Sequence, residues 1–289
     1  MQVFDNIDIK VVRNYIDWTP FFFTWEMRKK YPGILKDKVL GEQAIQLFDN
    51  ANRMLDNIIK NDWLKLKAVI GIWQANSDVD DVYLFENNKQ VATYNFLRQQ
   101  AKKSKANRCL ADFVAPLSSK KKDYIGSFVC TAGLGIEKQL AVFTLDQDDY
   151  NCIMLKAIAD RLAEALTEYM HEKIRKEIWG YATNEEFRNE DLIAEEYMGI
   201  RPAPGYTACP DHTEKLKIFE LLNAEKNIGV SLTESMAMSP NATVSGYYFS
   251  HPNAKYFSVG KVQDDQILDY AKRKDMSQEE VVKWLRSNI

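Results

Sequence analysis

The chain has 289 residues, 46% of them hydrophobic, which is enough to bury one large core or two smaller ones. Its 38 basic and 41 acidic residues nearly balance, so the composition argues against a basic nucleic-acid-binding face. No window reaches the roughly 20 apolar residues that a membrane span needs, and the apolar patch at residues 21–25 lacks the basic start of a secretion signal. We therefore expect a cytoplasmic protein with no membrane and no nucleic-acid partner.

The four cysteines are widely spaced and form no CxxC pair, and the chain has only three histidines. A structural zinc site needs clustered thiolates and imidazoles. We therefore expect no metal site and reduced, mostly buried thiols. The cysteines are Cys109, Cys130, Cys152 and Cys209.

The first predicted element is an amphipathic helix over residues 41–60, where apolar side chains recur every three or four positions. Three β-rich runs follow, and the polar pair Asn87-Asn88 separates the second run from the third. Such runs predict an antiparallel meander or hairpin. The runs lie at residues 68–73, 82–85 and 90–96.

A further strand is expected at residues 124–131, and the longest regular element follows it. No glycine or proline occurs between Tyr150 and Trp179, and an apolar stripe runs from Leu155 to Ile174. This pattern predicts one long helix.

Three acidic residues, Asp160, Glu164 and Glu168, recur at four-residue spacing along this helix. Like charges at that spacing weaken an isolated helix by a few tenths of a kcal/mol per pair. A solvated face is the simplest interpretation. The alternatives are an acidic docking ridge or a carboxylate that reaches a cationic ligand.

Prolines exclude an ordinary helix from residue 201 to residue 212. A helix is expected next at 213–225, opened by a capping arrangement of Asp211 and Glu214. Two short helices close the chain, the second with Ser277 as its N-cap. Strand-like runs between them lie at residues 231–238, 245–249 and 256–262.

The predicted strands gather in an early and a late group instead of alternating with helices. This order favours an α+β fold with a mostly antiparallel sheet over a parallel α/β fold. No repeat or low-complexity linker divides the chain, so we expect a single domain over residues 1–289.

Familiar catalytic motifs are absent: the chain has no GxSxG, no phosphate-loop lysine motif, no HExxH and no GxGxxG after a strand. We therefore predict no catalytic residue. A Rossmann-type methyltransferase or dehydrogenase is disfavoured for the same reason.

The segment Arg201-Pro202-Ala203-Pro204-Gly205-Tyr206 is the clearest candidate for ligand binding. Prolines hold the backbone extended, and a glycine lets it approach a ligand closely. Arg201 offers a planar fork that suits a carboxylate. The alternative is a rigid surface connection in which Arg201 forms an ordinary salt bridge.

Two aromatic segments are further candidates. Asp17 lies among aromatic residues at 15–22, where it either binds a ligand or turns the backbone before Pro20. The aromatic residues at 245–257 either pack in the core or form a wall beside a cation. Aromatic faces attract a cation such as a sulfonium by about 0.5 to 2 kcal/mol.

Seven motifs resemble, in order, the C-terminal activation domain of cobalamin-dependent methionine synthase. The resemblance runs from near the amino terminus almost to residue 289. The motifs are YIDWTPFF (15–22), CLADFVAP (109–116), DDYN (148–151), ADRLAEA (159–165), GIRPAPGY (199–206), LTES (232–235) and SGYYFSHP (245–252).

This resemblance implies a single C-shaped domain with a twisted antiparallel sheet, flanking helices and a long central helix. It implies that the chain binds S-adenosylmethionine and supports reductive methylation of cob(II)alamin to methylcobalamin, as part of a methyltransferase. The implied partners are the cobalamin-binding domain and flavodoxin or an equivalent flavoprotein. The chain alone would not methylate homocysteine, and a non-catalytic S-adenosylmethionine-sensing or docking module is the alternative.

The resemblance also assigns ligand contacts by matched motif. Asp17 would meet the ammonium of the methionine moiety and Arg201 its carboxylate, while Glu164 is a weaker candidate near the ligand. Asp160 would face the docked cobalamin domain. The remaining positions implied to line the groove are Ala203, Gly205, Tyr206, Ala208, Tyr256 and Phe257.

The chain departs from the family pattern at two positions. Thr207 stands where proline is common, and Phe257 stands where a second tyrosine is common. Neither change affects Asp17 or Arg201, so the resemblance still implies ligand binding.

Overall fold

The computed structural model describes residues 1–289 and is built around a six-stranded sheet in the order β4-β3-β2-β5-β8, with β1 paired to β2. Every strand pair in it is antiparallel, which confirms the predicted sheet type. A separate two-stranded ribbon pairs β6 with β7. The strands are β1 (Gln2–Phe4), β2 (Lys65–Asp78), β3 (Asp81–Glu86), β4 (Lys89–Asn95), β5 (Asp123–Leu134), β6 (Ser231–Leu232), β7 (Met238–Ser239) and β8 (Thr243–Tyr248).

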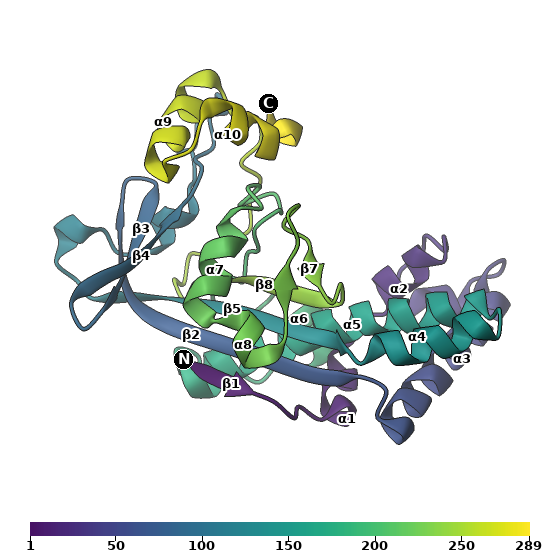
Figure 1. Ribbon diagram of the computed structural model, residues 1–289. Coiled ribbons are helices and arrows are strands. Elements are labelled where there is room, and N and C mark those ends of the chain that lie inside the picture. Colours follow the sequence, from purple (N-terminus) through teal and green to yellow (C-terminus); the bar gives the residue numbers. More distant parts are fainter.

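Ten α-helices surround the sheet (Figure 1). They are α1 (Ile9–Val12), α2 (Thr19–Thr24), α3 (Gly41–Asn61), α4 (Ile136–Leu145), α5 (Asp149–Lys173), α6 (Asn189–Ile193), α7 (Glu214–Leu222), α8 (Ala224–Ile228), α9 (Asp264–Lys274) and α10 (Gln278–Trp284). Short 3-10 helices occupy Arg13–Tyr15, Gly33–Lys36, Leu110–Phe113, Leu117–Ser119 and Arg286–Asn288.

The sheet separates two hydrophobic cores. Alternate residues of a strand face opposite sides, and in β2 Ala68 belongs to one core while Val69 belongs to the other. β5 does the same with Phe128 and Val129. One core is covered by α3 and α5, and the other by α7 to α10. Both long strands therefore contribute to both cores.

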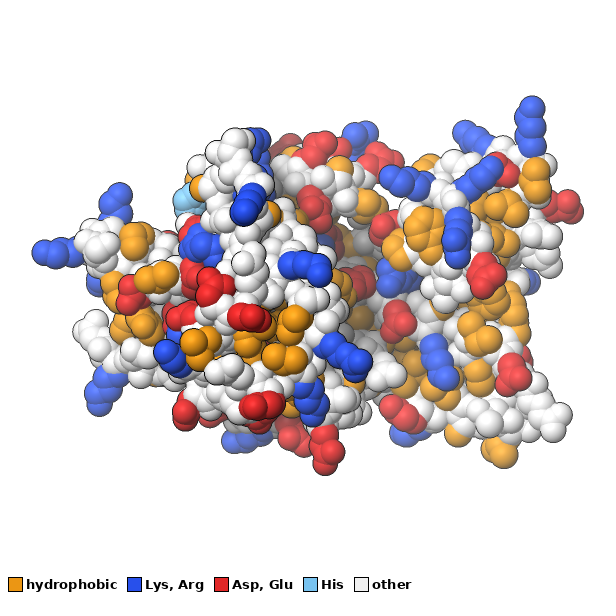
Figure 2. All heavy atoms as spheres, turned by 90° about the horizontal axis from the view of Figure 1, so that it is seen from above, with side chains coloured by type: hydrophobic (Ala, Val, Ile, Leu, Met, Phe, Trp, Pro, Cys, Tyr) orange, Lys and Arg blue, Asp and Glu red, His pale blue; other side chains and the backbone are white.

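The central helix α5 has 25 residues, and a π-helical turn at Ile174–Ile178 extends it. This confirms the long helix predicted for residues 150–179. Its N-cap is Asp148, whose side chain accepts a hydrogen bond from the Asn151 amide. Seen from above, the surface is hollowed between the end that carries α9 and α10 and the end formed by α2 to α4, as a C-shaped domain requires (Figure 2).

Several elements differ from expectation. The run at 256–262 is not a strand, because it pairs with the 201–212 loop through Val259 N–H and Thr207 O instead of joining the sheet. The helix expected at 213–225 is broken at Asn223, which has a left-handed backbone, into α7 and α8. Helix α4 was not predicted, because its apolar residues form no single stripe; Leu145 at its end is 83% exposed.

The segment at 231–238 forms only the two short strands β6 and β7, at its ends. The capping box expected at Ser277 is present: Glu280 N–H donates to Ser277 Oγ at 3.2 Å, and Ser277 N–H donates to Glu280 Oε2 at 3.0 Å. None of the helices combines the length and the apolar content needed to cross a bilayer.

Candidate ligand-binding groove

Two adjoining cavities, of about 410 and 290 Å³, form a groove between α5, the start of α2 and the 201–208 loop. Both cavities are lined by Glu164, Glu195 and Arg201, so they share a wall. Asp17 lines the first cavity and not the second. The second is bounded by Ala203, Tyr206, Ala208 and Tyr256. Seven of the nine residues predicted to bind the ligand thus converge here; Gly205 and Phe257 do not line either cavity.

Asp17 lies between a 3-10 turn and α2, and its Oδ1 accepts a hydrogen bond from Thr19 N–H at 2.9 Å. This is the backbone-turning role that the sequence suggested. The same carboxylate also lines the cavity. Oδ2 has no hydrogen-bond partner within the chain, so Asp17 can turn the backbone and still bind a cationic group.

Arg201 belongs to a buried network at the floor of the groove. Its Nη2 lies 2.6 Å from Glu168 Oε2 on α5, and its side chain is 18% exposed. Burial alone would lower the pKa of Arg201, but the Glu168 carboxylate, together with Tyr197, Tyr256 and Glu164, outweighs burial and the pKa is raised. Arg201 therefore stays cationic, and it forms the salt bridge of the alternative interpretation while facing the groove.

The three acids of α5 have different surroundings. Asp160 is exposed, Glu164 is half-buried in the groove, and Glu168 is buried. A step of four residues turns about 40° around a helix with 3.6 residues per turn, so the row rotates from solvent into the core. The interpretation as a solvated face is wrong for Glu168, whose pKa is raised by burial despite the opposing charges of Arg201 and Arg175.

The 201–208 loop is fixed by backbone hydrogen bonds on both sides. Tyr247 N–H of β8 donates to Pro202 O at 2.9 Å, and Gly205 N–H donates to Cys209 O at 2.7 Å. Gly205 has a φ of +95°, which favours glycine. Thr207, where the family commonly has proline, donates from Oγ1 to Phe257 O at 3.3 Å. This bond gives the loop an anchor that proline would lack.

The two aromatic positions at 256–257 have separate environments. The Tyr256 ring is 37% exposed and lines the groove, and its hydroxyl accepts from Arg201 N–H at 3.0 Å. Phe257 is 9% exposed and packs edge-on against Phe113 in the core. Its side chain therefore does not contact the groove, and only its carbonyl reaches the loop through Thr207.

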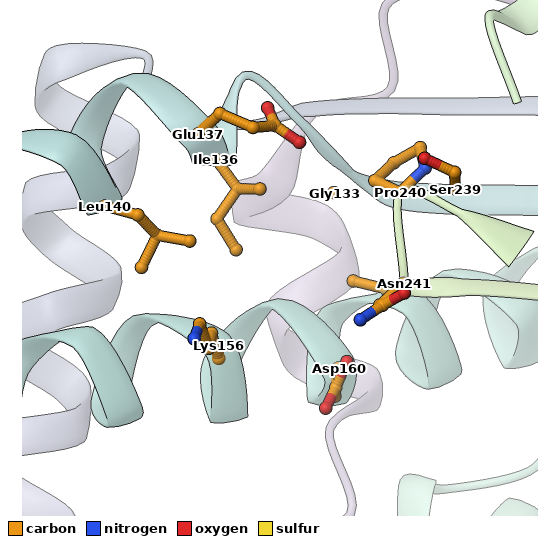
Figure 3. Close-up of a pocket in the computed structure, with 10 residues that line it drawn as sticks. Gly133, Ile136, Glu137, Leu140, Lys156, Asp160, Ser239, Pro240 and Asn241 are labelled. Carbon is orange, nitrogen blue, oxygen red and sulfur yellow. The ribbon is translucent and has the colours of Figure 1, made fainter.

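Asp160 lines a different cavity, of about 310 Å³, where α4 and α5 meet the turn between β7 and β8 (Figure 3). Lys156 lies one turn before it on α5, and Asn241 and Pro240 face it from the turn. Although the residue is exposed, partial desolvation by the surrounding cavity walls raises the pKa of Asp160, against the opposing charge of Arg161. Asp160 therefore lies outside the groove that Glu164 lines, and it is not positioned to contact a ligand bound there.

Glu195 is a groove residue that the sequence did not reveal. It lines both cavities and forms no ion pair, and its φ of +58° is uncommon for a residue other than glycine. It lies in a segment with several other acids, Glu190, Asp191 and Glu196. Nothing in the local pattern distinguishes it from them.

The fold and the groove define a mixed helix and sheet domain that presents an acidic, aromatic-lined small-molecule site. The chain matches the family described as vitamin B12 dependent methionine synthase, activation domain, over residues 8–275. It is also similar to a solved structure described as the crystal structure of the MetH reactivation domain bound to AdoHcy. That match has 52% sequence identity and a TM-score of 0.97, and it covers 100% of this chain and 90% of the other.

The chain therefore belongs to the activation-domain family of vitamin B12-dependent methionine synthase. This membership confirms the resemblance read from the seven motifs and implies a cobalamin-binding domain as its partner.

Proposed function

We propose that the groove binds S-adenosylmethionine, and that the chain thereby supports reductive methylation of cob(II)alamin to methylcobalamin on a partner domain. The observation that carries this proposal is the convergence of Asp17, Glu164, Arg201 and Tyr256 on one groove. Support also comes from the related reactivation domain, which was crystallised with AdoHcy.

The charges of the groove match the charges of this ligand. Asp17 would receive the ammonium of the methionine moiety, and Arg201 its carboxylate, as a charge-assisted pair. Glu164 and Glu195 form no ion pair within the chain and line both cavities, so they would attract the sulfonium cation. A neutral thioether product lacks that attraction, which favours exchange of product for substrate.

The adenosine portion would lie along the second cavity. The exposed rings of Tyr206 and Tyr256 offer stacking faces, and the backbone from residue 203 to residue 208 offers carbonyl and amide groups. Because the loop is already fixed by hydrogen bonds, it loses little conformational entropy when a ligand binds.

The chain's role in methyl transfer is to bind, orient and shield the donor. S-adenosylmethionine supplies an electrophilic methyl group, and the reduced cobalamin of the partner supplies the nucleophile. Loss of the methyl group to the partner's cofactor would leave a neutral thioether, and Asp17 and Arg201 would hold its methionine moiety in the groove during the transfer. Holding both reactants in line accounts for catalysis without an acid or base from the protein, which fits the absence of a nucleophilic motif.

The partners follow from the same proposal. Asp160 and its cavity would face the cobalamin-binding domain, and flavodoxin or an equivalent flavoprotein would supply the electron. The repair would take place in the cytoplasm. The chain alone would not methylate homocysteine, because its proposed role is to hold the methyl donor for a cofactor that the partner domain carries.

Calorimetric titration of S-adenosylmethionine into the purified chain tests the proposal. Asp17→Ala and Arg201→Ala should each weaken binding at least about tenfold, or about 1.4 kcal/mol. Asp49→Ala, on the exposed side of α3, is the matched control and should bind as the wild type does. A folded wild-type chain that fails to bind at millimolar ligand would overturn the proposal and leave the docking module as the better description.

A further inference from the structure

Neutral side chains hold one nitrogen of Arg201 beneath the groove. Arg201 Nη1 lies 3.2 Å from His171 Nδ1 and also donates to the Tyr197 hydroxyl. Nη2 faces Glu168 at 2.6 Å. A guanidinium carries five N–H donors. Both hydrogens of Nη1 and one of Nη2 are therefore in use, while Nε–H and the second hydrogen of Nη2 have no partner in the chain.

His171 is buried and neutral. Burial, reinforced by the charges of Arg201 and Arg175, holds the pKa of His171 well below its ordinary value. Because a neutral imidazole that accepts at Nδ1 carries its hydrogen on Nε2, that hydrogen points to the Tyr181 hydroxyl, 3.4 Å away. The imidazole stacks on Tyr248 with an interplanar angle of 13°, so its orientation is fixed.

Tyr197 is fixed in the same way. Burial raises its pKa, so its hydroxyl is neutral and accepts from Arg201. Its ring lies edge-on to His171 and 4.2 Å from the Arg175 guanidinium carbon. Neither His171 nor Tyr197 can rotate away without losing these contacts.

We infer that His171 and Tyr197 are positioning residues that orient Arg201 so that its Nε–Nη2 edge is the one left for the ligand's carboxylate. This inference rests on the proposed function and adds the two side chains that orient the arginine. Neutral acceptors suit this task, because a second carboxylate at Nη1 would cancel the charge that attracts the ligand. Neither residue needs to touch the ligand.

The experiment compares two ligands, S-adenosylmethionine and its decarboxylated form, by calorimetric titration. Tyr197→Phe removes one acceptor and keeps the ring, and His171→Leu removes the other. Each variant should bind S-adenosylmethionine at least about fivefold more weakly, and the decarboxylated ligand within about twofold of the wild type. His171→Asn places an amide oxygen near the Nδ1 position and should recover most of the lost affinity.

Tyr169→Phe is the matched control, because Tyr169 lies on α5 and contacts Tyr15 instead of Arg201. Equal losses for both ligands, or no loss for either, would overturn the inference while the proposed function stands. Wild-type failure to bind S-adenosylmethionine would overturn both. If His171→Leu does not fold, Tyr197→Phe decides the question, because it keeps every ring contact.

Discussion

At the residue scale, Gly205 is the position of the binding loop with the least room for a side chain. Its φ is +95°, and a Cβ built on it would lie 2.1 Å from His212 Cε1. The positive φ strains any L-residue, and the short contact requires the His212 ring to move. The loop conformation that presents Ala203 to Ala208 to the groove thus depends on this glycine.

Gly205→Ala should therefore lower the free energy of unfolding by about 2 to 3 kcal/mol and weaken S-adenosylmethionine binding, measured by urea denaturation and calorimetry. Gly33→Ala is the control, because a Cβ there meets nothing within 4 Å and its φ is not positive. It should change stability by less than about 0.5 kcal/mol. Equal effects of the two substitutions would contradict this account.

The sequence predicted only those groove residues that belong to a recognisable motif. Asp17 and Arg201 stand in long recognisable segments, and the structure places both on the groove. His171 and Tyr197 reach Arg201 only because α5 and the segment after α6 meet at the floor of the groove. His171 lies 30 residues before Arg201 in the chain, and Tyr197, only four residues before it, stands outside any helix or strand whose periodicity would place it on the same side.

At the element scale, α9 anchors the end of the binding loop to the rest of the molecule. Lys274, in the last turn of α9, pairs with Asp211 at the end of the loop and with Glu214 of α7 at 2.8 Å. Both side chains of the Asp211 pair are almost fully buried. Burial would raise the pKa of Asp211, but the charge and hydrogen bond of Lys274, together with the hydrogen bonds of Thr213, outweigh burial and lower that pKa.

Lys274→Met should lower the free energy of unfolding at neutral pH by about 3 to 5 kcal/mol, because it leaves the buried Asp211 carboxylate without a cation and leaves Glu214 with Lys217 alone. In the wild type the lowered pKa of Asp211 means that its contribution is present above about pH 4 and is lost as pH falls through the folded-state pKa. In the variant the uncompensated Asp211 carboxyl binds a proton more readily when the protein is folded, so acid reduces the cost of burying it.

Urea denaturation at several pH values checks this prediction. The difference in stability between wild type and Lys274→Met should narrow from pH 7 to pH 4. Lys272→Met, on the exposed side of the same helix, should match the wild type within about 0.5 kcal/mol at each pH. A constant difference across the range would mean that packing, and not charge, accounts for the loss.

Elements with strong periodicity were predicted well. The helix at 41–60 corresponds to α3, and its apolar positions from Ala44 to Ile58 face the core. The run at 256–262 has strand-like residues, but its buried side chains Phe257 and Val259 pack under the binding loop. Strand propensity indicates that a segment fits a half-buried surface, but it does not indicate whether another strand is available to pair with that segment.

At the scale of the whole molecule, one sheet supports two cores, and sequence patterns do not reveal this arrangement. β2 and β5 were predicted as strands, yet no sequence pattern indicates that α5 and α7 lie on opposite faces of them. Because each long strand alternates its side chains between the two cores, neither core can unfold without removing strands from the other.

We therefore predict one cooperative unfolding transition for residues 1–289. Leu155 on α5 is buried in one core and Leu222 on α7 in the other. Leu155→Ala and Leu222→Ala should each lower the free energy of unfolding by about 2 to 5 kcal/mol, and each should move the whole transition. Leu145→Ala, at an 83% exposed position of α4, should change it by less than about 0.5 kcal/mol.

The measurement is urea unfolding followed by far-ultraviolet circular dichroism and by tryptophan fluorescence. Coincident curves in the wild type and in both core variants are expected, because a shared sheet transmits the loss from either core to the other. Two separate transitions, with Leu155→Ala moving one and Leu222→Ala the other, would show that the cores unfold independently. The groove, whose walls come from α5 and from the loop beside β8, would then lose its alignment before the protein unfolds completely.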